Sequence, residues 1–491
     1  MRIIADPGVR TTLADYAAVA NLLHAVTALR AVAEAALPRL RDRTVWMVNS
    51  AAQGGGVAEL LPAQLSLLRE LGVDARWAVI ESRTPAFFAF TKRLHNLIHD
   101  VAEPHPTAAD RAMYDAVNAE NAELLAAHLK PHDIVVVHDP QPAGLARILK
   151  GRQGATLRTL WRSHIGLARE TSHTRAAWEF LRPDVEAYDR AVFTLADYVP
   201  EWLRARAAII HPSIDPLSHK NRDLSLHKLV GIMSDAGLVT PNWPLLEPPF
   251  ADSARRLQED GSFAPATVPE EIGLLGRPIV TQVSRWDGLK GFEPLLDAFV
   301  ILKADRDAPT RDHRHRRRVE EVRLILAGPD PTGIADDPEG VEVLRELTRR
   351  YVALPAALQR DIAIVTLPMV SRKDNALMVN VVQRASDIVL QNSLQEGFGL
   401  TVAEAMWKRI PVLGSGSASG IQLQVRDGVD GRLVDDPEDT RSIAALLREM
   451  LADSDRLEEW GRSAQRRVHD EFLVLRELVR WLELLPGPDA R

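Results

Sequence analysis

Short apolar runs alternate with helical patterns along the whole chain. In the first half, the runs typical of buried strands are Arg43–Ser50, Asp74–Glu81, Asp133–Asp139 and Thr156–His164. In the second half, they are Arg277–Ser284, Val322–Gly328, Asp361–Leu367, Asp387–Gln391 and Ile410–Gly414. The runs are nearly continuous in apolar residues rather than strictly alternating, which is typical of parallel strands covered by helices on both faces. This alternation of strands and helices predicts an α/β fold.

The two series of strands are separated by a proline-rich and polar stretch, Ile209–Asn221. We therefore predict two Rossmann-like, doubly wound domains, residues 1–212 and residues 213–464. The last segment, 465–491, has a helical pattern and is predicted to cross back onto the first domain. In open α/β sheets the ligand lies at the carboxyl ends of the strands. With two such domains facing each other, the active site is expected in the cleft between them.

Composition narrows the class of protein. The chain has 491 residues and no cysteine, which excludes disulfides, a thiolate nucleophile and a cysteine-based zinc site. The formal net charge of -7 gives no general reason to expect a nucleic-acid partner. The chain shows neither the apolar core of a signal peptide nor an apolar run long enough to span a bilayer, so we expect a cytoplasmic protein without a membrane partner. The basic run Arg306–Arg318 lacks interleaved aromatic residues and is interpreted as a solvated surface insertion.

The stretch QEGFGLTVAEAM, Gln395–Met406, predicts an anion site. It follows a predicted strand, carries two glycines, and continues into a helical pattern that begins near Gly397–Leu400. The amides and dipole at such a helix start favour negative charge. Two carboxylates, Glu396 and Glu404, flank this helix start. Taken alone, Glu396 could be a helix cap and Glu404 an exposed helix acid.

Two cations follow another predicted strand in VSRWDGLKG. Arg285 and Lys290 lie at its carboxyl end, where a guanidinium fork and a compact ammonium can converge on a diphosphate. The alternative is two surface cations in a loop. The predicted anion site at Gly397–Leu400 favours the diphosphate interpretation.

The run GSGSASG, Gly414–Gly420, is only superficially like a dinucleotide fingerprint. Its glycine spacing differs by one residue from G-x-G-x-x-G, and the following IQLQVRDG alternates like a strand or loop instead of opening a helix. A nicotinamide-dependent dehydrogenase is therefore disfavoured.

Arg285-x4-Lys290 together with Glu396-x7-Glu404 resembles the signature of retaining, nucleotide-sugar-dependent group 1 glycosyltransferases with the GT-B fold. Further stretches are similar to the trehalose glycosyltransferring synthases and the related trehalose phosphorylases. These stretches are residues 135–145, 161–166, 211–221, 336–340, 381–414 and 427–434. The resemblance covers roughly residues 130–440.

The resemblance implies a role for each candidate residue. His164, Arg285, Lys290 and Glu396 would be catalytic, with the two cations on the donor diphosphate, Glu396 facing the donor sugar and His164 near the reacting bond. Donor binding would fall to Gly55, Gly56, Phe398, Gly399, Leu400 and Glu404. Among these, Glu404 would accept hydrogen bonds from the ribose, and the loop Gly54–Gly56 would close over acceptor and phosphates. His138, Asp139 and Gln141 would line the acceptor site, although His138 is also typical of a structural residue and His164 of a satisfied core histidine.

The implied activity is transfer of a hexosyl group, glucosyl first, from a UDP-, ADP- or GDP-hexose to a sugar or sugar-like acceptor, with trehalose as the leading product. No metal or other cofactor is expected, because cations already serve the phosphates. WRSHIGLARET lacks the acid that many trehalose synthases carry after His-Ile, and Gly414–Gly420 departs from their glycine loop. An aminocyclitol or pseudo-sugar transferase, a trehalose phosphorylase and a catalytically inactive nucleotide-sugar-binding protein stay open as alternatives, and so do a monomer and a homodimer.

Overall fold

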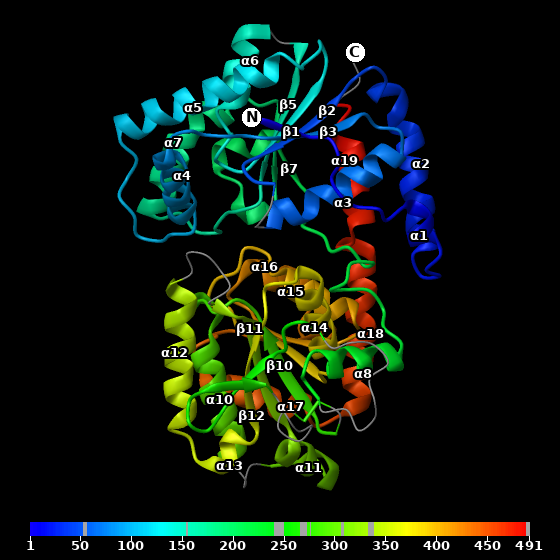
Figure 1. The fold of residues 1–491 in the computed structure, drawn as a ribbon, viewed down its shortest axis with the longest axis vertical. Coiled ribbons are helices and arrows are strands. Elements are labelled where there is room, and N and C mark those ends of the chain that lie inside the picture. The colour runs from blue at the N-terminus through cyan, green and yellow to red at the C-terminus, as the bar shows by residue number, and fades with distance from the viewer. Residues whose placement is uncertain are drawn as a thin grey trace. The chain divides into compact units, whose positions relative to one another are not determined.

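The computed structural model describes residues 1–52, 56–153, 156–239, 250–265, 273–274, 276–305, 309–331 and 338–487. It divides into two compact units, each described here by itself (Figure 1). The first unit is Met1–Asp215 with Glu471–Arg491, and the second is Pro216–Asp470. The chain thus passes between units at 215–216 and 470–471, a few residues beyond the predicted divisions at 212–213 and 464–465.

The first unit is built on a sheet of strand order β1-β3-β2-β4-β5-β6-β7. The strands are β1 (Arg2–Ile4), β2 (Val45–Asn49), β3 (Ala75–Val79), β4 (Ile134–His138), β5 (Arg158–Ser163), β6 (Arg190–Phe193) and β7 (Ala207–Ile209). Neighbouring strands are parallel except for β1, which runs antiparallel to β3. β2 and β4 are buried along their whole length, as their continuous apolar runs predict.

Helices cover both faces of this sheet. They are α1 (Leu13–Ala17), α2 (Leu23–Leu40), α3 (Gly56–Glu70), α4 (Pro85–Ile98), α5 (Ala108–Ala126), α6 (Leu145–Gln153), α7 (Ser172–Val185) and α19 (Val474–Leu484), with the 3-10 turns η2 (Ala196–Tyr198) and η3 (Glu201–Arg206). Helices α2, α3 and α19 pack together on one side, and α4, α5, α6 and α7 on the other (Figure 1).

The C-terminal helix α19 is anchored in the first unit by backbone pairing. Ile214 donates its N–H to the Phe472 carbonyl at 2.9 Å, and Val474 donates to the Ile214 carbonyl at 3.0 Å. The predicted return of the C-terminal segment to the first domain is therefore confirmed. The return begins at Phe472 and continues through α19, after the preceding helix α18 (Ser454–Glu471) has ended.

The second unit holds a sheet of strand order β15-β14-β13-β10-β11-β12-β8-β9. The strands are β8 (Arg255–Leu257), β9 (Phe263–Pro265), β10 (Ile279–Val283), β11 (Arg323–Pro329), β12 (Ile362–Leu367), β13 (Ile388–Gln391), β14 (Val412–Ser415) and β15 (Gly431–Val434). The strands from β10 to β15 are parallel, whereas β8 and β9 form an antiparallel edge.

The remaining helices also cover two faces. They are α8 (Leu226–Asp235), α10 (Phe292–Ala304), α11 (His313–Glu321), α12 (Pro338–Val352), α13 (Ala356–Gln359), α14 (Arg372–Arg384), α15 (Leu400–Trp407), α16 (Ser419–Gln424), α17 (Thr440–Met450) and α18, with the turn η4 (Gly288–Lys290). One core contains residues of α10, α12, α17 and α18, and the other contains residues of α8 and α14. Alternate residues of β11 enter the two cores, as a doubly covered sheet requires.

Strand order defines where a ligand can bind in each unit. In the first unit, the order reverses between β2 and β4, and in the second between β10 and β13. At such a switch point the loops that follow the two strands diverge, which opens a crevice at their carboxyl ends. The candidate residues that follow β4 and those that follow β10 and β13 lie at these two points.

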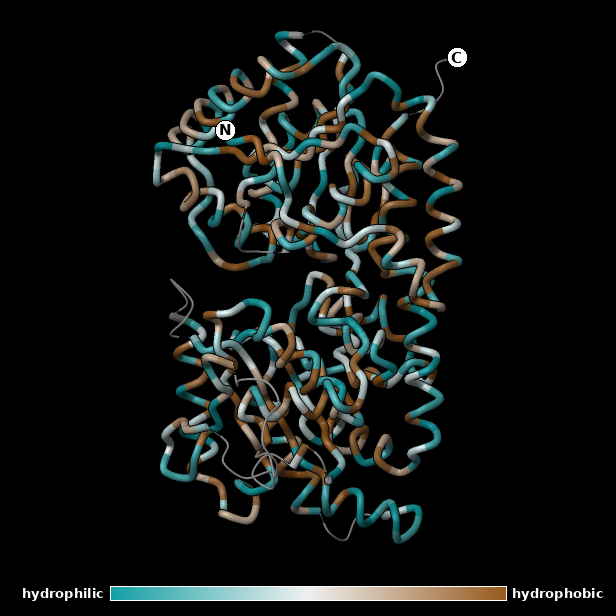
Figure 2. Tube along the Cα trace, turned by 45° about the vertical axis from the view of Figure 1, so that its right-hand side comes forward, coloured by the Kyte–Doolittle hydropathy of each residue, from teal (hydrophilic) through white to brown (hydrophobic). Residues whose placement is uncertain are grey.

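Hydropathy along the chain matches this layering, with hydrophobic segments inside each unit and hydrophilic segments on the outer loops (Figure 2). The basic run Arg306–Arg318 forms part of α11 from His313 on. This helix is hydrophilic over most of its length (Figure 2), although His315 is buried and its imidazole lies 2.9 Å from the Arg448 carbonyl. Among the described residues, no helix is both long and apolar enough to cross a membrane.

One sequence prediction is wrong. The residues after Gly414–Gly420 were expected to form a strand or loop, but Ser419–Gln424 form helix α16. The alternation of apolar and polar residues in this segment suggested a strand, but the polar Gln424 is buried. Its amide donates to the carbonyls of Phe398 and Gly420, at 2.5 and 3.0 Å, so the polar side chain belongs to the packed face of the helix.

Candidate functional site

Two loops meet at the switch point of the second unit. Gln282, inside β10, accepts the Asn392 N–H at 2.9 Å and donates to the Lys290 carbonyl at 2.8 Å. Asn392 in turn donates its side-chain amide to the Gly291 carbonyl at 3.2 Å. Gly291 has φ +60°, and a Cβ there would lie 2.1 Å from the Asn392 carbonyl oxygen. Glycine at this position therefore allows the two loops to touch.

Lys290 and Glu396 form a close ion pair across these loops. The Lys290 Nζ lies 2.6 Å from Glu396 Oε2, and the side chains are 14% and 15% exposed. Ser393 Oγ donates to the same carboxylate oxygen at 3.3 Å. Glu396 also lies beside the start of α15, since a Cβ on Gly399 would lie 3.0 Å from the Glu396 Cγ, so its position fits both the ion pair and the helix-cap alternative.

Arg285 is placed differently from Lys290. Its side chain is 70% exposed, and its guanidinium lies 3.6 Å from Asp287. The neighbouring Trp286 is buried and donates its indole N–H to the Pro329 carbonyl at 2.7 Å. This anchor holds the loop in place while the guanidinium of Arg285 extends into solvent.

The glycine stretch before α15 is held by α16. Gly399 has φ +83°, a left-handed conformation that favours glycine, and Leu400 begins the helix. A Cβ on Gly420 would lie 2.4 Å from the Cα of Phe398, so α16 packs directly against this stretch. The first amides of α15 lack partners within the helix, which makes this helix start suited to an anion.

Glu404 lies inside α15 and is buried, with only 6% exposure. Its carboxylate lies 3.5 Å from the Nζ of Lys220, and its backbone carbonyl accepts a hydrogen bond from Lys408 Nζ at 3.1 Å. Burial lowers the pKa of Lys408 to about 7, with Glu404 opposing the shift. Glu404 is therefore not the ordinary exposed helix acid that its sequence position allows.

In the first unit, His138 and His164 lie at the ends of the adjacent strands β4 and β5. Their rings are stacked, and His138 Nδ1 lies 3.0 Å from His164 Nε2, so one imidazole donates to the other. Burial and the nearby Arg162 guanidinium lower the pKa of His138 to about 3 and the pKa of His164 well below its usual value. Both rings are thus neutral around pH 7.

Asp139 links the carboxyl ends of strands β4 and β5. Its carboxylate accepts the His164 N–H at 2.8 Å, and its carbonyl accepts the Trp161 indole N–H at 3.0 Å. It adopts φ +66°. Burial raises the pKa of Asp139 to about 6, although the His164 amide and Arg162 oppose the shift. Nearby, the Gln141 Oε1 is buried and has no hydrogen-bond partner within the described ranges.

Two buried residues behind this pair were not found from the sequence. Arg162 is fully buried, and its guanidinium nitrogens have no hydrogen-bond partner in the described part of the chain. Glu477 of α19 is also buried, bonds Ser213, and opposes the lowering of the Arg162 pKa to about 10. A charged residue inside the apolar run Thr156–His164 is the one signal that could have marked Arg162.

The glycine loop cannot be compared with its prediction, since Gly55 lies outside the described residues and Gly56 is the first residue of α3. Within the described ranges, no group of three or more histidine or acidic side chains is arranged to hold a metal ion. The other predicted residues fall into two clusters, one in each unit. His138, His164, Asp139 and Gln141 follow β4 and β5, and Arg285, Lys290, Glu396, Phe398, Gly399, Leu400 and Glu404 follow β10 and β13.

Known proteins resemble this chain along nearly its whole length. Residues 47–200 match the family described as Trehalose synthase, N-terminal domain, and residues 268–467 match Glycosyl transferases group 1. The trehalose synthase of Thermococcus litoralis is 36% identical over 94% of this chain and 93% of its own length. The trehalose phosphorylase of Pleurotus pulmonarius is 26% identical over 91% of this chain and 57% of its own length.

Solved structures show the same fold. An α,α-trehalose-phosphate synthase (UDP-forming) from Burkholderia xenovorans, in complex with glucose-6-phosphate, superposes with a TM-score of 0.62. It covers 90% of this chain and 100% of its own, at 15% sequence identity. Because the sequence identity is only 15%, this similarity supports the fold and nothing beyond it.

Proposed function

Because this chain belongs to the trehalose synthase family of group 1 glycosyltransferases, we propose that it transfers a glucosyl group from a nucleoside diphosphate sugar to glucose, with retention of configuration. Glycosyl transfer related to trehalose, on a GT-B fold, is what the similarity supports directly. The donor, the acceptor and the stereochemistry are the proposal.

The observation that carries the proposal is the Lys290–Glu396 pair at the switch point of the second unit. Its Nζ–Oε2 distance is 2.6 Å, and it lies next to the start of α15. A sugar nucleotide presents hydroxyls and a diphosphate, which require carboxylates and cations respectively. A partly buried carboxylate and ammonium beside a helix start offer both kinds of partner at one place.

On the donor side, each residue has a separate task. The ammonium of Lys290 and the exposed guanidinium of Arg285 stabilise the charge that grows on the leaving diphosphate. The Glu396 carboxylate accepts hydrogen bonds from the donor sugar. The amides of Gly399 and Leu400 face its oxygens. Buried Glu404, at 6% exposure, accepts hydrogen bonds from the ribose, a task that accounts for an acid kept inside the fold.

On the acceptor side, His138 and His164 form a neutral pair 3.0 Å apart that donates and accepts hydrogen bonds without adding charge. A histidine whose pKa lies well below 7 is a poor base at neutral pH. We therefore assign the acceptor proton to the leaving phosphate, on the same face of the sugar, which also accounts for retention without a protein nucleophile. Acceptor hydroxyls bind to Asp139 and to the Gln141 Oε1, which is buried without a hydrogen-bond partner among the described residues.

Relatives suggest the first substrates to test. The solved relative is described as UDP-forming and holds glucose-6-phosphate, whereas the relative with the highest identity quoted above is a trehalose synthase. UDP-, ADP- and GDP-glucose are therefore the first donors and glucose the first acceptor. The cations of the donor site make a catalytic metal unnecessary in this proposal.

The test is release of nucleoside diphosphate, followed by ultraviolet absorbance in a coupled assay, from each sugar nucleotide with and without glucose. We expect acceptor-dependent release from at least one glucose donor. Absence of release with every donor, together with glucose transfer from glucose 1-phosphate, would replace the proposal by a phosphorylase. Binding of nucleotide sugars without turnover on any acceptor would indicate an inactive binding protein.

A further inference from the structure

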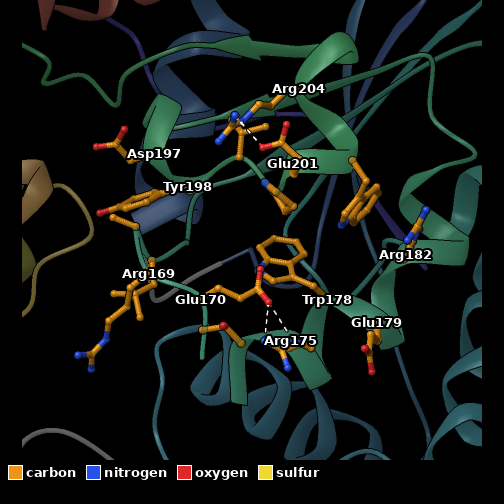
Figure 3. Close-up of a pocket in the computed structure, with 16 residues that line it drawn as sticks. Arg169, Glu170, Arg175, Trp178, Glu179, Arg182, Asp197, Tyr198, Glu201 and Arg204 are labelled. Carbon is orange, nitrogen blue, oxygen red and sulfur yellow. Dashed lines mark hydrogen bonds and ion pairs between the residues drawn. The ribbon is translucent and has the colours of Figure 1, made fainter. Parts of the chain in front are cut away.

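A cavity in the first unit is lined by residues other than those assigned to transfer. It has a volume of about 400 Å³ and is lined by the loop Leu167–Glu170, by helix α7 and by the turn Asp197–Arg204 (Figure 3). This volume falls within the range of about 300–1,000 Å³ that is typical of small-molecule sites.

The cavity wall continues from the loop that carries His164. A Cβ on Gly166 would lie 2.4 Å from the Cβ of Tyr198, so the loop is pressed against the turn η2. Thr194 also donates its hydroxyl to the His164 carbonyl at 3.3 Å. The loop after His164 and the turn η2 are therefore held together by packing.

An indole forms the centre of the cavity. Trp178 is half-buried, and its ring packs edge-on against Trp161 and tilted against Phe193, each with ring centroids 6.1 Å apart. These two contacts fix the ring from the side of the core. Trp202, also in the lining, carries the Arg182 guanidinium 5.2 Å from its ring centroid. Each of the two indoles in the cavity therefore packs against a neighbouring side chain of the same unit.

Two arginine–glutamate pairs flank this indole from opposite sides (Figure 3). Arg175 and Glu170 lie 2.8 Å apart, and Arg204 and Glu201 lie 2.7 Å apart. Each pair presents donors and acceptors together and carries no net charge. Such pairs form hydrogen bonds with hydroxyl groups, which donate and accept at the same time, better than with an anion.

We propose that this cavity is a second sugar-binding site, in which a neutral saccharide ring stacks on Trp178 while its hydroxyls bond the two flanking arginine–glutamate pairs. The C–H face of a pyranose is apolar and fits an indole, whereas its edge carries hydroxyls. The proposal goes beyond the proposed reaction, because no step of glucosyl transfer uses these residues.

The test uses fluorine NMR of the whole protein grown with 5-fluorotryptophan. The chain has 10 tryptophans, and Trp178→Phe assigns the Trp178 resonance by its disappearance. Maltose and trehalose are titrated without nucleotide, and inorganic phosphate is titrated separately. We expect a saturable shift of Trp178 with a disaccharide and none with phosphate, while the fully buried Trp46 stays unchanged.

Two single-residue variants then distinguish sugar binding by the arginine–glutamate pairs from a general effect of removing a surface charge. Arg175→Ala removes one flanking pair and is expected to weaken disaccharide binding by about tenfold. Arg152→Ala is the matched control, since Arg152 forms an exposed pair with Glu123 at 3.9 Å elsewhere in the same unit. Equal disaccharide affinities of the two variants would overturn the assignment of the arginine–glutamate pairs as hydroxyl-binding groups.

The result that overturns the site itself is a Trp178 resonance unmoved by up to roughly 50 mM disaccharide, an upper limit for weak sugar binding. A Trp178 shift with phosphate that excess maltose does not reverse would also overturn it, in favour of an anion site. Both readouts are independent of turnover. A chain that transfers no glucose can still show the Trp178 shift, so failure of this proposal and failure of the proposed function are distinguishable.

Discussion

Replacing Asp139 by asparagine is expected to make the protein more stable at high pH while leaving it unchanged at low pH. Burial raises the pKa of Asp139 from 3.8 to about 6, so the folded state favours the protonated acid. The corresponding stability is fully present below the unfolded value of 3.8 and is lost as the pH rises through 6. Asparagine does not titrate, so the variant avoids this loss.

The magnitude follows from the shift. About two pKa units correspond to about 3 kcal/mol, of which roughly 2 kcal/mol is lost between pH 4.5 and pH 8. The substitution introduces little else, because the asparagine oxygen can accept the His164 N–H that Asp139 now accepts at 2.8 Å. Asparagine also tolerates the left-handed backbone of this position, φ +66°.

The assay is urea-induced unfolding of wild type and variant at several pH values from 4.5 to 8. We expect the difference in free energy of unfolding between the two proteins to grow by roughly 2 kcal/mol across this range. Asp42→Asn is the matched control, because Asp42 has φ +62° and is exposed. Carbon NMR of the Asp139 carboxyl should show a midpoint near pH 6. A difference that does not change with pH would refute the burial argument.

The other predictions concern the donor site. Arg285→Ala and Lys290→Ala should each reduce turnover by about a hundredfold. Only Lys290→Ala should also lower the stability, by about 1–3 kcal/mol, since it removes the ammonium that neutralises the partly buried Glu396 carboxylate. Near-normal turnover of either variant would remove that residue from the mechanism. Glu404→Gln should weaken binding of the bare nucleoside diphosphate in calorimetry, and unchanged affinity would contradict a ribose contact. Turnover should survive EDTA, and complete loss that magnesium or manganese restores would disprove the metal-free donor site.

Much of the fold could be predicted because buried parallel strands leave a strong signal. The apolar runs from Arg43–Ser50 to Ile410–Gly414 all contain strands of the two sheets. The strands β1, β6, β7, β8, β9 and β15 were not predicted; each has only three or four residues, and Arg2, Arg190 and Arg255 interrupt the apolar pattern of β1, β6 and β8. Helix α16 was missed because a tertiary contact of Gln424 overrides local alternation.

The candidate site was predictable in its residue types but not in its pairings. Lys290 and Glu396 are each marked by a strand end and a glycine loop, yet their contact at 2.6 Å depends on β10 and β13 being neighbours in the sheet. The burial of Glu404 depends on packing that a helical pattern alone does not specify. Arg162 and Glu477 approach each other only after α19 has returned to the first unit, so nothing local in either segment points to the other.

The central claim is tested most directly by proton NMR of the product formed from an α-linked glucose nucleotide and glucose. We predict acceptor-dependent formation of a non-reducing disaccharide with the small anomeric coupling of an α,α-linkage. A large coupling from a β-linked product would contradict retention. An α-linked product formed only with another acceptor, such as an aminocyclitol, would contradict the assignment of glucose as acceptor.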